Sequence, residues 1–355
     1  MALKNPYTMK GMLPIDSEMF FGREKEMRRI EDMLTGVTPQ CVSIIGERRI
    51  GKSSLAWRVF HKVKKEENTL AVFLDCGGLA EECKSKEQFF QRLNKCFLED
   101  NPGVEEPGKS FFEDYSTFKN FTRSSGRKGK KTIIFLDEFE HLPDNGFADD
   151  TFFSNLRSMA NNPKNLSAFV TISKTPLKEL THDSIQASTF WNIFNNKIIG
   201  LLDHRDITEL RRCGFTRKKF SLTGEETGKI HYYANDFAFF NQVVCAFIWD
   251  AKMDGDDLDW DRLETEIYEY YEKMWQGRSK EEQKLLKSLK SKDNNILLKE
   301  IRTRGIVRKE KEYYLPFSDY FSHLIKDTLE IERESFGDKA GKVLDTALKV
   351  KKVMK

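Results

Sequence analysis

Eight residues near the start of the chain have the types and spacing needed to hold a phosphate. The segment Gly46–Ser53 reads Gly-Glu-Arg-Arg-Ile-Gly-Lys-Ser and follows a short apolar run, Cys41–Ile45. Its glycines let backbone N–H groups converge on phosphate oxygens, and a helix that begins there adds its N-terminal dipole. In this pattern Lys52 reaches the β- and γ-phosphates, and Ser53 ligates Mg²⁺. The predicted phosphate contacts are Gly46, Glu47, Arg48, Arg49, Ile50, Gly51, Lys52, Ser53 and Ser54.

Two acidic residues after another apolar run could act on the same nucleotide. The run Thr132–Leu136 predicts a buried strand that ends at Asp137 and Glu138, about 85 residues after the glycine loop. There Asp137 can hold Mg²⁺ through water, so the predicted metal ligands are Ser53 and Asp137, while Glu138 can polarise the attacking water. An acidic pair can also cap the next helix, but its presence downstream of a glycine loop favours the catalytic interpretation.

A further strand, Ala168–Ile172, ends in Thr-Ile-Ser-Lys. A polar side chain at this end can sense the γ-phosphate, and we expect Ser173 rather than Thr171 to do so. A serine without function at the end of a strand remains the alternative. The predicted catalytic residues are therefore Glu138, Lys52 and Ser173.

The elements around these residues predict an α/β fold. Apolar strands alternate with helices, which favours a five-stranded parallel sheet with helices on both faces, as in a P-loop NTPase core. After Leu202 the strand pattern stops and helices follow, then two helices and a hairpin-like segment that predict a winged helix. The expected parts are an extended lead-in (1–20), the core (21–202), a helical lid (203–276), a winged helix (277–330) and a basic helical tail (331–355). The segment Arg123–Lys131 reads as a basic loop, for which exposure to solvent is favoured over contact with nucleic acid.

Composition limits the class of protein. The chain has 355 residues, 39% of them hydrophobic, and its longest apolar runs are strand-sized, far short of the roughly 20 residues that span a bilayer. No signal peptide is visible, and six scattered cysteines show no metal-ligand spacing, so we expect buried thiols in a reducing cytoplasm. From Gly277 onward 20 of the 59 basic residues meet 13 of the 56 acidic ones, so this end carries +7 and the rest −4.

Around its motifs the sequence resembles the STAND ATPases (signal-transduction ATPases with numerous domains) and their relatives, the archaeal ATPases and the origin-recognition group of AAA+ proteins. The resemblance rests on Phe20–Glu24 ahead of the glycine loop and covers roughly residues 5–330. It also includes Asn5–Tyr7 and Tyr271–Trp275. It implies that the segment near Phe20 packs beside the adenine, so the candidate base contacts are Tyr7, Phe21, Gly22 and Arg23. For each of these, a purely structural role is the alternative.

The sequence departs from these families in two places. Where they carry a glycine-glycine-x-proline turn in the lid, this chain reads Asn-Asp-Phe-Ala from Asn235. No arginine lies between Arg157 and Arg205, the stretch that holds the arginine finger of ring-forming AAA+ ATPases. Because such a finger contributes about 10³–10⁵ in rate, we expect slow hydrolysis and a switch rather than a motor.

Three functions account for these features to different extents. The favoured one is a regulatory ATPase switch that binds ATP or ADP with Mg²⁺, changes conformation or forms homo-oligomers with nucleotide state, and acts on an effector in trans, since few residues follow the predicted winged helix. The resemblance implies a role in prokaryotic defence or stress signalling. The alternative is a DNA-associated ATPase, similar to an initiator or a transposition regulator, that binds DNA through a basic winged helix. A small-molecule kinase explains neither the lid nor the C-terminal module.

Overall fold

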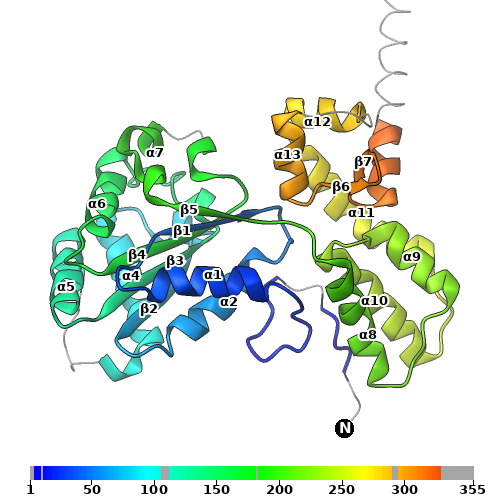
Figure 1. Cartoon of the computed structure of the whole chain (residues 1–355), viewed down its shortest axis with the longest axis horizontal. Coiled ribbons are helices and arrows are strands. Elements are labelled where there is room, and N and C mark those ends of the chain that lie inside the picture. The colour runs from blue at the N-terminus through cyan, green and yellow to red at the C-terminus, as the bar shows by residue number, and fades with distance from the viewer. Residues whose placement is uncertain (1–3, 9–10, 105–111, 181–182, 290–294, 329–355) are drawn as a thin grey trace, which may run out of the picture. The chain divides into compact units, whose positions relative to one another are not determined.

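The computed structural model of the chain describes residues 4–8, 11–104, 112–180, 183–289 and 295–328 (Figure 1). The chain divides into two compact units. Met9–Leu210 form the sheet unit, and Met1–Thr8 together with Arg211–Lys355 form the helical unit. The five segment boundaries expected from the sequence remain predictions, and the expected basic tail, 331–355, lies outside the described residues.

A five-stranded sheet forms the centre of the sheet unit. Its strands are β1 Val42–Gly46, β2 Thr69–Asp75, β3 Lys131–Asp137, β4 Ser167–Ser173 and β5 Asn195–Ile199. Their order is β2-β3-β4-β1-β5, and every neighbouring pair is parallel, as the sequence predicts. Since the carboxyl ends of parallel strands share one edge, the segments that follow β1 and β3 lie at the same edge.

The register of the sheet places the sequence motifs relative to one another. Strand β4 lies between β1 and β3, whereas β2 lies at the edge of the sheet. Ser173 is aligned with Ile45, next to the start of the glycine loop. Two residues earlier, Thr171 is aligned with Leu136. Ser173 is thus closer than Thr171 to the carboxyl edge of the sheet, which we call the functional edge.

Helices flank this sheet (Figure 1). They are α1 Glu24–Thr35, α2 Lys52–Val63, α3 Leu79–Glu82, α4 Lys86–Asp100, α5 Tyr115–Arg127, α6 Asp150–Ala160 and α7 Asp183–Ser188. Short 3-10 segments are η1 Pro102–Val104, η2 Phe139–His141, η3 Leu177–Glu179 and η4 Phe190–Ile193. Helix α2 packs against β1 to β4, while α4, α5 and α6 pack against β2, β3 and β4, respectively. Phenylalanines fill the space between these helices; the rings of Phe89 and Phe152, for example, are 5.1 Å apart.

The prediction of a basic loop over Arg123–Lys131 is wrong, because α5 continues to Arg127. Glycine at position 126 suggested a break in the chain, but here it serves helix packing. A Cβ atom on Gly126 would lie 2.3 Å from the carbonyl oxygen of Lys164. The helix needs a residue without a side chain at this close approach.

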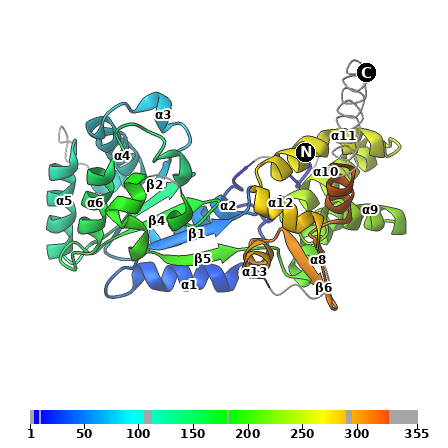
Figure 2. The same cartoon turned by 90° about the horizontal axis from the view of Figure 1, so that it is seen from above.

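The helical unit follows the element order that the sequence predicts (Figure 2). Its helices are α8 His204–Thr216, which continues from the sheet unit, α9 Gly224–Ala234, α10 Ala238–Asp254, α11 Trp260–Gln276, α12 Lys280–Lys287 and α13 Ile296–Thr303. An antiparallel hairpin, β6 Val307–Glu310 and β7 Tyr313–Pro316, and helical residues 319–328 come next. Assignment of the last elements as a winged helix stays a prediction.

Aromatic stacking joins helices α10 and α11 to the residues after the hairpin. Tyr271 of α11 stacks on Phe240 of α10 with ring centroids 4.1 Å apart. The ring of Phe317 is nearly parallel to that of Tyr271, and the two ring centroids are 5.7 Å apart. All three side chains are almost completely buried, so they form one core within the helical unit.

The N-terminal residues pack into the helical unit. The ring of Tyr7 lies 5.2 Å from that of Phe215, and its hydroxyl donates to the carbonyl of Arg211. Asn5 donates to the carbonyl of Ala246 at 3.0 Å. A Cβ on Gly214 would overlap the Tyr7 ring. The two ends of the chain thus contribute to one unit.

In the part of the chain that the structure describes, no helix is long and apolar enough to cross a membrane. All six cysteines are free thiols, and five are buried.

Candidate nucleotide-binding site

The glycine loop joins β1 to α2 at the carboxyl edge of the sheet. Arg49 and Gly51 have φ values of 68° and 102°, so the loop reverses direction just before the helix. Helix α2 begins at Lys52 without a side-chain cap on its first turn, whereas Ser85, for example, caps α4. An uncapped helix N-terminus leaves N–H donors for an anion. The backbone therefore fits the phosphates that the sequence predicts.

The Lys52 ammonium lies among polar groups of the loop. It donates to the carbonyl of Glu47 at 3.0 Å. Burial lowers the pKa of Lys52, while the carboxylates of Glu140, Glu47, Asp137 and Glu138 act in the opposite direction. A lysine held in this way can stabilise the negative charge of bound phosphates.

Ser53 and Asp137 meet where a metal ion is expected. The Ser53 hydroxyl donates to Oδ1 of Asp137 at 3.1 Å. Asp137 is 8% exposed, and burial raises its pKa to about 6 against the opposing hydrogen bond from Ser53. A hydroxyl and a carboxylate are oxygen donors of the kind that Mg²⁺ binds beside phosphates. The donor set thus fits Mg²⁺.

Glu138 combines a constrained backbone with an accessible carboxylate. Its φ of 48° lies in the left-handed region, and its N–H donates to Oδ1 of Asp137 at 3.0 Å. Its side chain is 51% exposed, and Oε2 lies 3.9 Å from Nε2 of His141. Strained backbone in non-glycine residues clusters at functional sites. The geometry suits a base that acts on water at this edge.

The two candidate sensors on β4 differ in their partners. Ser173 is fully buried, and its hydroxyl donates to the carbonyl of Thr175 at 2.7 Å. The Thr171 hydroxyl is buried too and has no hydrogen-bond partner among the described residues. Position in the register favours Ser173, and its role as a sensor stays a prediction.

Other predicted phosphate contacts lie in or beside the loop. Arg48 and Arg49 are exposed, whereas Ile50 is buried. A Cβ on Gly46 would lie 2.4 Å from the carbonyl oxygen of Ile199, so this glycine permits close packing of β1 and β5. Another predicted contact, Ser54, accepts a hydrogen bond from the N–H of Leu13 at 3.0 Å.

The segment predicted to contact adenine packs against residues that follow β5. The Arg23 guanidinium donates to the carbonyl of Gly200. Gly22 has a φ of 67°, and its α-carbon lies so near Asp206 that a Cβ would be 2.6 Å from Oδ2. Phe21 is half-buried. Their contacts with a base remain predictions, as does that of Tyr7, which lies in the helical unit.

Three residues near the site were missed by sequence reasoning. Glu140 and His141 follow the acidic pair directly, and their chemistry could have been noticed in the run Asp-Glu-Phe-Glu-His. One carboxylate oxygen of Glu140 is buried and has no hydrogen-bond partner in the described part of the chain. The third residue is Gly77, two positions after β2; its only sequence signal is a glycine pair after a strand.

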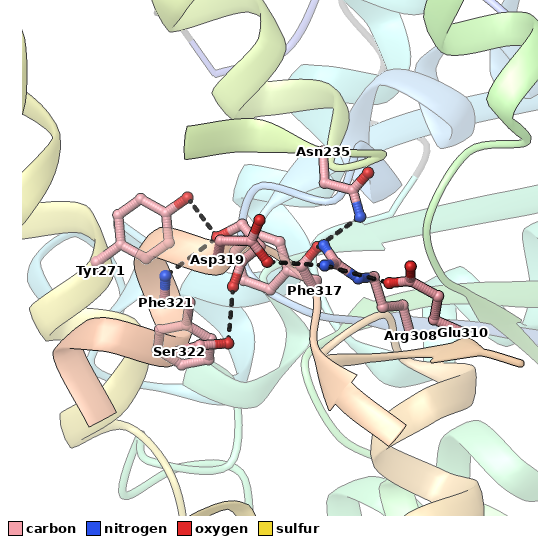
Figure 3. A network of polar contacts seen from close by, with 9 residues as sticks. Asn235, Tyr271, Arg308, Glu310, Phe317, Asp319, Phe321 and Ser322 are labelled. Carbon is pink, nitrogen blue, oxygen red and sulfur yellow. Dashed lines mark hydrogen bonds and ion pairs between the residues drawn. The ribbon is translucent and has the colours of Figure 1, made fainter. Parts of the chain in front are cut away.

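In the helical unit, the turn between α9 and α10 replaces the family's glycine turn. Asn235 has a φ of 39°, which a glycine would adopt more readily. Its amide donates to the carbonyl of Phe317 at 2.8 Å (Figure 3). Its own carbonyl accepts from Arg211 and from Asn241, each at 2.7 Å. These bonds explain how an asparagine is held in this conformation.

Comparisons with known proteins agree with this geometry. A family model described as an AAA domain matches residues 35–179, and one described as Novel STAND NTPase 2 matches residues 115–270. The Walker-type ATPase paby2304 of Pyrococcus abyssi is similar with a TM-score of 0.63 at 14% identity, over 90% of this chain and 99% of that chain. The Aeropyrum pernix ORC2 protein, solved in ADPNP-ADP complexes, gives 0.51 at 12% identity, over 90% and 98%. No curated protein matches the chain by sequence.

The fold is that of a P-loop NTPase, and the two family models indicate an AAA+-like ATPase. The fold class predicted from the strand pattern and the resemblance stated from the motifs are both confirmed.

Proposed function

We propose that the chain is a regulatory ATPase switch that binds ATP or ADP with Mg²⁺ and hydrolyses ATP slowly. One observation carries the proposal. The Ser53 hydroxyl, at the uncapped start of α2, donates to Asp137 at the end of β3. This hydrogen bond joins the phosphate-binding loop to the acidic pair in one site.

The residues of this site divide the work of hydrolysis. Backbone N–H groups of the glycine loop and the Lys52 ammonium hold the phosphates, and Ser53 and Asp137 would hold Mg²⁺, which when bound would offset phosphate charge. Glu138 accepts a proton from water as the water oxygen bonds to the γ-phosphorus. The bond from that phosphorus to the bridging oxygen breaks, giving ADP and phosphate. A hydroxyl at Ser173 reports the presence of the γ-phosphate.

The positions of arginines along the sequence support slow turnover. The sequence has none between Arg157 and Arg205, where related ring-forming ATPases carry a finger. Without such a donor, the charge of the transition state lacks the stabilisation that a finger gives.

Contacts inside the helical unit support a switch that moves as one body. The Asn235 side chain donates a hydrogen bond to the carbonyl of Phe317, the residue after β7 (Figure 3). Tyr271 of α11 adds a contact with the Ser318 hydroxyl at 3.2 Å. We propose that nucleotide state changes the arrangement of the two units, favours self-association, and so controls a partner protein in trans, in defence or stress signalling.

A DNA-binding role is the second candidate, and the structure changes its basis. Two of its basic residues are engaged internally. Arg304 pairs with Glu282, and Arg308 donates to Asp319 at 2.8 Å. Among the described residues of this region, the exposed basic residues are Lys280, Lys284, Lys299, Arg302, Lys309, Lys311 and Lys326. Binding would be salt-sensitive; an electrophoretic shift that falls as salt rises from 50 to about 200 mM would support it.

Nucleotide binding tests the proposed function directly. Lys52→Ala should weaken binding of ATP by about 100-fold, since charge-assisted hydrogen bonds contribute about 1.5–3 kcal/mol each. Isothermal titration measures this. Lys62→Ala is the matched control, because Lys62 lies on the same helix, and its half-exposed ammonium donates to the Glu31 carboxylate at 3.2 Å. Equal affinity of all three proteins, or no phosphate release from ATP by wild type, would contradict the proposal.

A further inference from the structure

The turn after β2 is tied to the end of β3, where the acidic pair lies. Asp75, the last residue of β2, is aligned with Asp137. The next residue, Cys76, donates its N–H to the carbonyl of Asp137 at 2.9 Å. Gly77 donates its N–H to Oδ1 of Asp75 at 2.8 Å. These bonds fix the backbone of position 77 beside the functional edge.

Gly77 has no room for a side chain, and the obstacle is Glu138. A Cβ atom built on Gly77 would lie 2.3 Å from Oε2 of Glu138 and 3.4 Å from its Cδ. Real Cβ atoms essentially never come within 3.0 Å of another heavy atom. A side chain at position 77 and the observed place of the Glu138 carboxylate therefore exclude each other.

The backbone of Gly77 gives no other reason for a glycine. Its φ lies outside the left-handed region, so alanine can adopt the same conformation without strain. What alanine would disturb most is the carboxylate end of the Glu138 side chain, which is half exposed; Oδ1 of Asp75, 3.2 Å from the added Cβ, would need to give way only slightly. Substitution should therefore move the carboxylate and spare the fold.

His141 is a second neighbour of this carboxylate. The N–H of Glu138 donates to Asp137 and so anchors its backbone, which favours a response of the side chain to a methyl group at position 77. His141 lies 3.9 Å from Oε2. Gly77 and His141 thus limit where the carboxylate can lie.

We propose that Gly77 is a positioning residue, whose missing side chain keeps the Glu138 carboxylate at the place where it acts on the attacking water. The inference rests on the proposed role of Glu138 in hydrolysis. The turn after β2 then affects hydrolysis only by setting the position of the Glu138 carboxylate.

The neighbouring glycine provides a matched control. A Cβ on Gly78 meets nothing within 4 Å, and its φ is −93°. We expect Gly77→Ala to lower kcat for ATP at least 10-fold with an ATP Kd within twofold of wild type. Gly78→Ala should keep kcat within twofold. Melting temperature, titration of ATP and phosphate release are measured on the full-length chain.

A double substitution shows whether the effect acts through Glu138. In the Glu138→Gln background, Gly77→Ala should lower turnover no further, because the displaced group no longer acts as a base. In the Glu138→Asp background it should also add little, since the shorter side chain withdraws from the new methyl group.

Each outcome decides one of the two claims. If wild type hydrolyses ATP and Glu138→Gln has no effect, the proposed role of Glu138 is wrong. If Glu138→Gln lowers turnover but Gly77→Ala does not, only the positioning role is wrong. Equal losses from Gly77→Ala in wild type and in both backgrounds would also overturn it, and the double variants give this answer even if the single variant melts early.

Discussion

Two polar clusters, one in each unit, contain a non-glycine residue with a positive φ. They differ in how fully the polar groups of that residue are bonded to the protein. In the helical unit Asn235 (φ 39°) is 4% exposed and bonded through its side chain (Figure 3) and also through its N–H and its carbonyl. In the sheet unit Glu138 (φ 48°) is bonded through its backbone, but its carboxylate is half exposed. The first cluster is closed by protein groups, whereas the second leaves an ionisable group toward solvent.

This difference separates a structural junction from a ligand site. A buried polar group without a partner costs free energy, and the side-chain N–H, main-chain N–H and carbonyl of Asn235 all have protein partners. Some groups at the carboxyl edge of the sheet lack them. Helix α2 starts without a side-chain cap, and one oxygen of Glu140 is buried without a partner among the described residues. Such groups fit a site that a ligand completes.

The largest effect is expected at Glu138. Glu138→Gln should reduce ATP turnover about 10²–10⁴-fold, the usual contribution of a general base. Nucleotide affinity and melting temperature should stay near wild type, because the carboxylate is not needed to hold the fold. Single-turnover phosphate release and thermal melting measure this. A large loss of stability without loss of turnover would contradict this prediction, because Glu138 would then be a structural residue like Asn235.

The next effect is expected at Asn235, and it concerns stability. Asn235→Ala should lower the free energy of unfolding by about 2–3 kcal/mol, since it removes a buried hydrogen bond and places alanine at a positive φ. Asn235→Gly separates the two causes, because glycine accepts the conformation and loses only the amide, at about 1 kcal/mol.

Urea unfolding with an unchanged slope measures both Asn235 variants. ATP affinity should stay unchanged in each. If Asn235→Gly abolished ATP binding while unfolding was unaffected, this turn would be a nucleotide contact, and the comparison would fail at its structural end.

The smallest effect is expected on β4 and decides between its two candidate sensors. Thr171→Val should stabilise the protein by about 1 kcal/mol, because it replaces a buried hydroxyl without a partner by a methyl group, and turnover should not change. Ser173→Ala should lower turnover about 10-fold, the loss of one hydrogen bond of about 1.4 kcal/mol. Steady-state kinetics and denaturant unfolding compare the two. Reversal of the kinetic result would assign the sensor to Thr171.

The sequence alone predicted the phosphate-binding motifs and determined the class of the sheet. The glycine loop is one contiguous segment, and the acidic pair follows its own strand directly, so local spacing shows their chemistry. Alternation of apolar strands and helices indicated the parallel sheet, which the structure confirms. The basic loop predicted around Gly126 was wrong because the sequence does not show whether a glycine ends a helix or permits close packing within one.

Only the tertiary structure decided which side chains meet across the chain. The Asn235–Phe317 bond spans 82 residues, and Tyr7 reaches a carbonyl 204 residues away. Glu138, which follows β3, occupies the space where a side chain at position 77 would lie. Arg304 and Arg308 are paired with acidic residues within the helical unit. Periodicity reports which face of an element is apolar, but not which element that face meets. Charges counted as a DNA-binding surface and a glycine passed over as a simple turn therefore gained their meaning only in three dimensions.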